Sequence, residues 1–166
     1  MEINEILAQL KSLSKQADET IASMKYKESQ MFEEYCENLV NKINDIYEEL
    51  SPLLRMVDDK PFFIEVTRRT EDKYVFGLVL EKDAFNFATY GGSYGYRIRS
   101  DFDGFHGDRN CEYTRNQYKM LVDNWDVWKE TVFTEFTKKY TERIEKRLAE
   151  ATEQFETHKE EWTFRE

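Results

Sequence analysis

Four short stretches decide the fold: PFFIEVTRR at 61–69, YVFGLVLEK at 74–82, AFNFATY at 84–90 and SYGYRIRS at 93–100. In three of them aromatic and aliphatic residues alternate with polar or small ones, whereas 74–82 is apolar on both faces, which predicts a central strand. This alternation predicts β-strands, because successive side chains of a strand point to opposite faces. The linkers between the stretches are too short for parallel crossovers, which need a dozen or more residues. We therefore expect a four-stranded antiparallel meander.

Two long segments without internal glycine flank this predicted sheet, and their apolar residues recur at helical spacing. Ser51-Pro52 predicts the end of the first helix and the start of a short one, while a second start at Asp18 is left open. Thr114 and Gln117 form a capping box at the start of the last helix. The chain is thus predicted to be one α+β domain with five parts: a long helix (1–50), a short helix and loop (51–60), the antiparallel sheet (61–100), a loop (101–113) and a second long helix (114–164).

The apolar stripes of the two long helices change width along the chain. The first stripe is narrow up to Met24 and wide from Met31, whereas the last is wide up to Phe136 and narrow from Tyr140. A narrow stripe suits a two-helix seam, and a wide stripe suits a helix covered on two sides. If the helices run antiparallel, narrow meets narrow and wide meets wide. The widths predict an antiparallel helical stalk that carries a globular head.

This stalk brings the two chain ends together, so we expect Leu10 to lie near Leu148 or Phe155. A helix–meander–helix chain with a coiled stalk is similar in outline to prefoldin-type chaperones, although the sequence shares no motif with them. Two helices would leave much of the apolar stripe over Ile3–Met24 exposed on a projecting seam of this stalk. Because exposed apolar stripes mark contacts, we expect a homo-oligomer.

Composition narrows the classes of partner. The 166 residues carry a net charge of −10, with 13 acidic and 7 basic residues in 1–60 and a nearly neutral middle. A net basic face is needed to bind a phosphate backbone, so direct nucleic-acid binding is disfavoured and a protein with a basic surface is favoured. Two cysteines, no signal-peptide pattern and no membrane-length apolar run predict a cytoplasmic protein.

The loop after the strands is the one candidate for metal chemistry. Asp101, Asp103 and Glu112 fall on positions 1, 3 and 12 of an EF-hand loop, whose carboxylates bind calcium. His106 stands where the turn glycine belongs, so a turn leading into a helix is the favoured interpretation. A thiol nucleophile at Cys111 with His106 as its base lacks an orienting third group. We expect no cofactor and no enzymatic activity.

Two surfaces are candidate binding sites. Arg69, Tyr90, Arg97 and Arg99 are predicted on one face of the sheet, where guanidinium groups and a ring would hold a small anionic molecule. The favoured alternative is a solvent face whose arginines pair with Glu65, Glu81 or Asp101. The second surface is a set of acidic residues on the first helix, which would occupy a basic groove: Glu33, Glu34, Glu37, Glu48 and Glu49.

The sequence therefore favours a small, acidic, non-enzymatic protein-binding module. It has the profile of an inhibitor or anti-defence type protein that occupies a basic surface of a nucleic-acid-handling partner. A domain that binds or sequesters a small anion on the Arg/Tyr face is the alternative.

Overall fold

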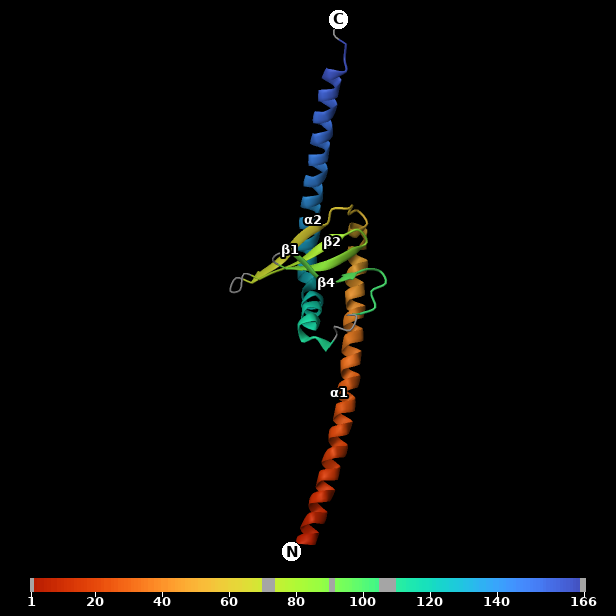
Figure 1. Cartoon of the computed structure of the whole chain (residues 1–166), viewed down its shortest axis with the longest axis vertical. Helices are drawn as coiled ribbons and strands as arrows, with labels where there is room; N and C mark the ends of the chain where they lie inside the picture. Colours follow the sequence, from red (N-terminus) through yellow and green to blue (C-terminus); the bar gives the residue numbers. More distant parts are fainter. Residues whose placement is uncertain (1, 70–73, 90–91, 105–109, 165–166) are drawn as a thin grey trace.

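A computed structural model describes residues 2–69, 74–89, 92–104 and 110–164 of the chain. It has two long helices and four strands, which confirms the α+β class and the antiparallel meander. In chain order the elements are α1 (Ile3–Leu54), β1 (Phe62–Arg69), β2 (Tyr74–Glu81), β3 (Ala84–Thr89), β4 (Gly92–Ile98) and α2 (Glu112–Glu161) (Figure 1).

The sheet has the order β1-β2-β3-β4, and every neighbouring pair is antiparallel. One face is aromatic and aliphatic and packs against the two helices. Phe76 at its centre lies 5.6 Å from the ring of Phe87 and 5.2 Å from the ring of Trp128 on α2. At the edge strand, Phe62 meets the ring of Phe136 at 5.1 Å. These contacts join the sheet to α2 and form the centre of the core.

The helices contribute to this core with only part of their length. The buried residues of α1 lie between Cys36 and Leu54, and those of α2 lie between Gln117 and Phe136. These are the segments in which the sequence stripe is wide, because each is covered by the other helix and by the sheet. The remaining parts of both helices extend beyond the head (Figure 1).

The predicted antiparallel stalk is wrong, because the two helices run in the same direction and are staggered. The guanidinium of Arg115 lies 5.2 Å from the ring of Phe32, and farther along both helices the indole of Trp125 donates to Glu49 at 2.7 Å. Positions on the two helices thus increase together. The N-terminus and the C-terminus lie at opposite ends of the molecule (Figure 1). Leu10 and Leu148 are 55% and 66% exposed, and the outline shared with prefoldin-type chaperones is lost with the stalk.

The connection between the sheet and α2 explains the parallel direction. Phe102 is buried and stacks on Tyr118 of α2 with a ring distance of 6.0 Å. Its carbonyl accepts a hydrogen bond from the Asn44 amide of α1 at 3.2 Å. This segment carries the chain back along the head, so α2 starts beside Phe32 rather than beside the end of α1. Wide stripes still meet in this arrangement, so stripe width alone does not fix helix direction.

Two local predictions also change. The first helix has no break at Asp18, as the favoured interpretation had it, but α1 continues through Pro52 to Leu54, so the short helix after Ser51 does not form. A helical proline leaves the carbonyl four residues earlier without its donor. Here the Ser51 hydroxyl donates to that carbonyl, the one of Glu48, at 3.2 Å. At the other helix, Thr114 is not the N-cap.

Helix α2 instead begins at Glu112, with Cys111 as its N-cap in extended geometry. The backbone amide of Arg115 donates to the Cys111 carbonyl at 3.0 Å. Because Glu112 places a negative charge in the first turn, where the helix dipole is positive, the earlier start is electrostatically favoured.

The turn between β2 and β3 is fixed to the end of α1. Asp83 has a φ of 59°, a left-handed geometry that aspartate tolerates better than most residues. Its amide donates to the Leu54 carbonyl at 3.3 Å, and its carbonyl accepts from the Tyr47 hydroxyl at 3.0 Å. Burial and the nearby Asp83 carboxylate raise the pKa of Tyr47, so this hydroxyl keeps its proton. These two hydrogen bonds fix the position of the β2–β3 turn along the axis of α1.

Candidate functional site

An acidic strip runs along the outer face of α1, beside the head. All four of its side chains are exposed, and their spacing places them on one face of the helix, opposite the buried residues. Asp45 belongs to this strip although the acidic runs of the sequence did not include it. Between residues 34 and 48, all of which the structure describes, the one base is the exposed Lys42, which lies at the edge of this face, three residues before Asp45. We call this surface the acidic strip: Glu34, Glu37, Asp45 and Glu48.

The other two predicted partner-binding acids differ from the strip. Glu49 faces α2, where its carboxylate accepts from the Trp125 indole at 2.7 Å and lies 3.4 Å from the Lys129 ammonium. Glu49 therefore holds α1 and α2 together. Glu33 is exposed but lies toward the edge of the strip. The helical period, rather than the clustering of acids in the sequence, separates these roles.

The arginines of the sheet face carboxylates of their own chain. Arg97 extends across β3 to Glu81 on β2, with 2.7 Å between Nε and Oε2. Arg99 lies 3.6 Å from Asp101. Both partners belong to the set that the sequence offered as the alternative to a ligand. Exposed pairs of this kind contribute about 0–1 kcal/mol. The Arg69 side chain and the whole of Tyr90 lie outside the described residues.

The residues with an EF-hand-like spacing are not brought together into a site. Asp101 and Asp103 are exposed in the connection after β4, and Glu112 is the first residue of α2. Within the described ranges, no three His, Cys, Asp or Glu side chains are arranged to hold a metal ion. His106, the proposed base for Cys111, lies outside the described residues.

A groove that the sequence did not reveal lies between the segment before β1 and the middle of α2. It has a volume of about 730 Å³ and a mixed lining, with Asp58 and Asp59 opposite Lys139 and Arg147. Arg143 forms its floor. The guanidinium lies 3.6 Å above the ring of Phe62, and it donates to the carbonyls of Lys60 at 2.6 Å and Pro61 at 3.3 Å. No periodic pattern in the sequence marks this residue.

The same contacts perturb Asp58. A hydrogen bond from the Lys60 amide, 2.9 Å long, and the charges of Arg143 and Arg147 lower the pKa of the Asp58 carboxyl below its ordinary value of 3.8. A carboxyl with a lowered pKa stabilises the fold above its ordinary pKa and loses this contribution as the pH falls through the lowered value. Protonation of Asp58 at low pH is therefore expected to weaken its contacts with the Lys60 amide and with Arg143.

We expect Arg143→Ala to lower the free energy of unfolding by about 1–3 kcal/mol, because it removes charge-assisted hydrogen bonds and a cation–π contact. Arg143→Lys should recover only part of this loss, since an ammonium cannot donate in the planar fork of a guanidinium. Urea denaturation followed by circular dichroism measures both. Lys138→Ala, an exposed change on the same helix, is the control. Equal stability of Arg143→Ala and this control would show that the contacts of Arg143 with Phe62, Lys60 and Pro61 contribute nothing to stability.

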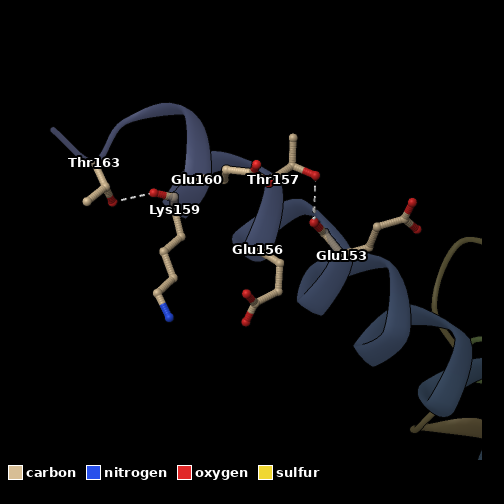
Figure 2. A pocket seen from close by; sticks show the side chains of 6 residues that line it. All are labelled: Glu153, Glu156, Thr157, Lys159, Glu160 and Thr163. Atoms are coloured by element: carbon tan, nitrogen blue, oxygen red, sulfur yellow. Dashed lines mark hydrogen bonds between the residues drawn. The ribbon is translucent and has the colours of Figure 1, made fainter. Parts of the chain in front are cut away.

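A hollow near the C-terminal end of α2 has only one wall. Figure 2 shows that its side chains all project from the same helix end, and that two threonines bond back to the helix backbone. Thr157 donates to the Glu153 carbonyl at 3.0 Å, and Thr163 donates to the Lys159 carbonyl. A ligand would be exposed to water on every other side. The lining residues are Glu153, Glu156, Thr157, Lys159, Glu160 and Thr163.

Comparison with known proteins gives no functional assignment: no family model, no curated protein and no solved structure matches this chain. Neither long helix in the described part of the chain contains a stretch apolar enough to span a bilayer.

Proposed function

We propose that this chain is a non-enzymatic protein-binding module that docks its acidic strip on a basic protein surface. The observation that supports the proposal is the placement of Glu34, Glu37, Asp45 and Glu48 on one exposed helix face, with one base, Lys42, at its edge. The helix beneath them is held rigidly, because its opposite face is buried in the core. A rigid, pre-formed charged face loses little conformational entropy on binding.

A nucleic-acid-handling protein fits this surface best, since its own binding groove has a basic lining that complements the strip. By occupying such a groove, the chain would act as an inhibitor, in the manner of an anti-defence protein. Complementary charge of this kind acts mainly on the rate of association and on the choice of partner.

Charge reversal tests the proposal. The triple variant Glu34→Lys, Glu37→Lys and Glu48→Lys should lose the protein that the wild-type chain captures from a lysate of its source organism. With that purified partner, the association rate constant should fall by roughly 10-fold or more, and raising the salt concentration should have the same effect on the wild type.

The matched control carries the same change of charge on the exposed surface of α2: Glu145→Lys, Glu153→Lys and Glu156→Lys. It should bind at nearly the wild-type rate. If both triple variants slow association equally, net charge alone governs binding and the acidic strip is not the docking surface.

A further inference from the structure

The first half of α1 has an apolar seam but no partner in the described chain. We call residues 3–31 the arm. Six of its residues, all apolar except Ser14, follow the alternating spacing of three and four that is typical of a coiled coil. Leu7 and Ile21 are each 45% exposed, so the described chain leaves the seam largely uncovered. We define the arm seam by six residues at heptad positions a and d: Leu7, Leu10, Ser14, Ala17, Ile21 and Met24.

The opposite face of the arm is mostly polar or small, with Gln9, Gln16 and Ser23 spaced seven residues apart, and the exposed Tyr26 is its aromatic exception. The arm is therefore amphipathic over most of its length. Isolated helices gain little stability from helix propensity alone, and a contiguous apolar stripe marks a contact surface. A seam with this spacing is typically covered by another helix.

The geometry of the head limits what this helix can be. Cover from α2 begins at Phe32, where Arg115 lies over the ring, and the seam below this point is open. The open length is about 42 Å by the rise of an α-helix. The same arm from a second copy has the required length and the required apolar face. Placed antiparallel, Ile3 of the second copy reaches the level of Glu28, just before the level at which α2 begins with Glu112.

The charges beside the seam select one antiparallel register. When Leu10 packs opposite Ile21 of the second copy, the flanking Lys11 lies opposite Asp18 of the second copy, and symmetry repeats the pair. A shift of one heptad in one direction brings Lys11 opposite Lys25 of the second copy, and a shift in the other brings the two copies of Lys11 together. Like charges across a helix pair are destabilising.

A parallel alignment is less favourable. It sets Lys11 beside Ile6 of the second copy and Asp18 beside Leu13, so the flanking charges have no opposite partner. In the antiparallel register, Ser14 and Ala17 meet at the centre, where their small side chains permit a close approach of the two helices.

We propose that a second copy of this chain binds the arm, forming a two-stranded antiparallel coiled coil symmetric about the midpoint between Lys15 and Gln16. The inference stands independently of the acidic strip. It assigns the seam to self-assembly and gives the register: Leu7 on Met24, Leu10 on Ile21 and Ser14 on Ala17, each from opposite copies.

Sedimentation velocity at about 50 µM chain, well above a micromolar dissociation constant, should give twice the chain mass of 20.1 kDa. The double variant Leu10→Asp and Ile21→Asp should sediment as a monomer. The control Ala8→Asp and Ala22→Asp, which places the same charges outside the seam, should remain a dimer. A monomeric wild type, or dissociation of both variants alike, would overturn the proposal. Unchanged unfolding of the head in urea verifies that both variants fold.

Cysteine crosslinking tests the register in a Cys111→Ser background, with the buried Cys36 left in place. An equimolar mixture of Leu10→Cys and Ile21→Cys chains should form a mixed disulfide. Leu10→Cys alone should crosslink poorly, because the two copies of position 10 lie about 16 Å apart along the axis. Efficient crosslinking of Leu10→Cys alone indicates a parallel pair and contradicts the proposal.

Charge exchange provides a second test. Lys11→Asp alone should raise the dimer dissociation constant several-fold, because it sets a carboxylate against Asp18 of the other copy in both symmetric pairs. Adding Asp18→Lys should restore the wild-type constant. If the second change weakens the dimer further, these residues do not face each other.

Discussion

Replacement of Phe76 by alanine is expected to lower the free energy of unfolding by about 3–5 kcal/mol, the usual cost of removing a buried phenyl ring. The ring is fully buried at the centre of the sheet and contacts Phe87 and Trp128. Its loss leaves a cavity between the sheet and α2, which neither layer can close without moving a backbone element. Urea denaturation monitored by circular dichroism gives the value.

The matched control for this variant is Phe155→Ala. Phe155 is 62% exposed on the part of α2 that extends beyond the head, and it has no ring partner there among the contacts of the described residues. Its replacement should change stability by no more than about 0.5 kcal/mol. If both phenylalanines cost the same, the core does not lie where the structure places it.

Gly77→Ala should also be strongly destabilising. A Cβ atom at this position would lie 2.5 Å from the Ile64 carbonyl oxygen and 3.3 Å from Cζ of Phe63. Because the closest atom belongs to the backbone of β1, rotation of a side chain cannot relieve the overlap. The strands must separate, near the irregularity between Glu65 and Thr67, at a cost of about 1–3 kcal/mol.

Lys82→Ala, an exposed change in the turn that follows the same strand, is the control for Gly77→Ala. The midpoint of its urea unfolding transition should equal that of the wild type. A Gly77→Ala protein as stable as this control would mean that β1 and β2 are not as close as described.

The strands could be predicted from the sequence because the relevant signals are local. Alternation in 61–69 depends on residues two apart, the apolar run in 74–82 marks a central strand, and the short linkers leave only antiparallel pairing. Helix boundaries were less accurate, since they depend on single hydrogen bonds. The Ser51 hydroxyl donates to the Glu48 carbonyl, which Pro52 leaves without a backbone donor, and this bond supports the continuation of α1 through Pro52. The helix propensities of the residues do not reveal such a bond.

The relative direction of the helices could not be predicted from the sequence. It depends on where the segment around Phe102 crosses the head, and this segment is fixed by Asn44 and Tyr118, residues distant in the sequence. The stripe widths fit both directions equally well. The sequence predicted that much of Ile3–Met24 is exposed on the seam of a two-helix stalk. These residues are exposed, but for another reason: the stalk does not form and no helix of the described chain covers them.

Some features of the candidate sites follow from local sequence signals, and others depend on contacts between distant residues. Helical period assigns Glu34, Glu37 and Glu48 to one exposed face, which sequence reasoning identified in part. The partner of Glu49 is Trp125, 76 positions away, and the role of Arg143 depends on carbonyls 82 and 83 positions away. Such contacts leave no periodic signal and require the folded chain.

The two proposals have a joint geometric consequence. In the antiparallel dimer, the acidic strips of the two copies lie near opposite ends, about 75 Å apart by the rise of the helices. Two basic sites at a similar separation would be bound together, and the second contact would then be intramolecular.

The staggered, parallel arrangement of α1 and α2 is the central claim, because it exposes the arm and sets the positions of all other surfaces. Donor and acceptor dyes on Ser12→Cys and Glu156→Cys, in a Cys111→Ser chain mixed with a large excess of unlabelled protein, test it within single chains. The contacts of Glu49 with Trp125 and of Phe32 with Arg115 place these positions roughly 90–100 Å apart by helix rise. The structure predicts almost no energy transfer, whereas nearly complete transfer would show that the helices fold back on each other and would contradict it.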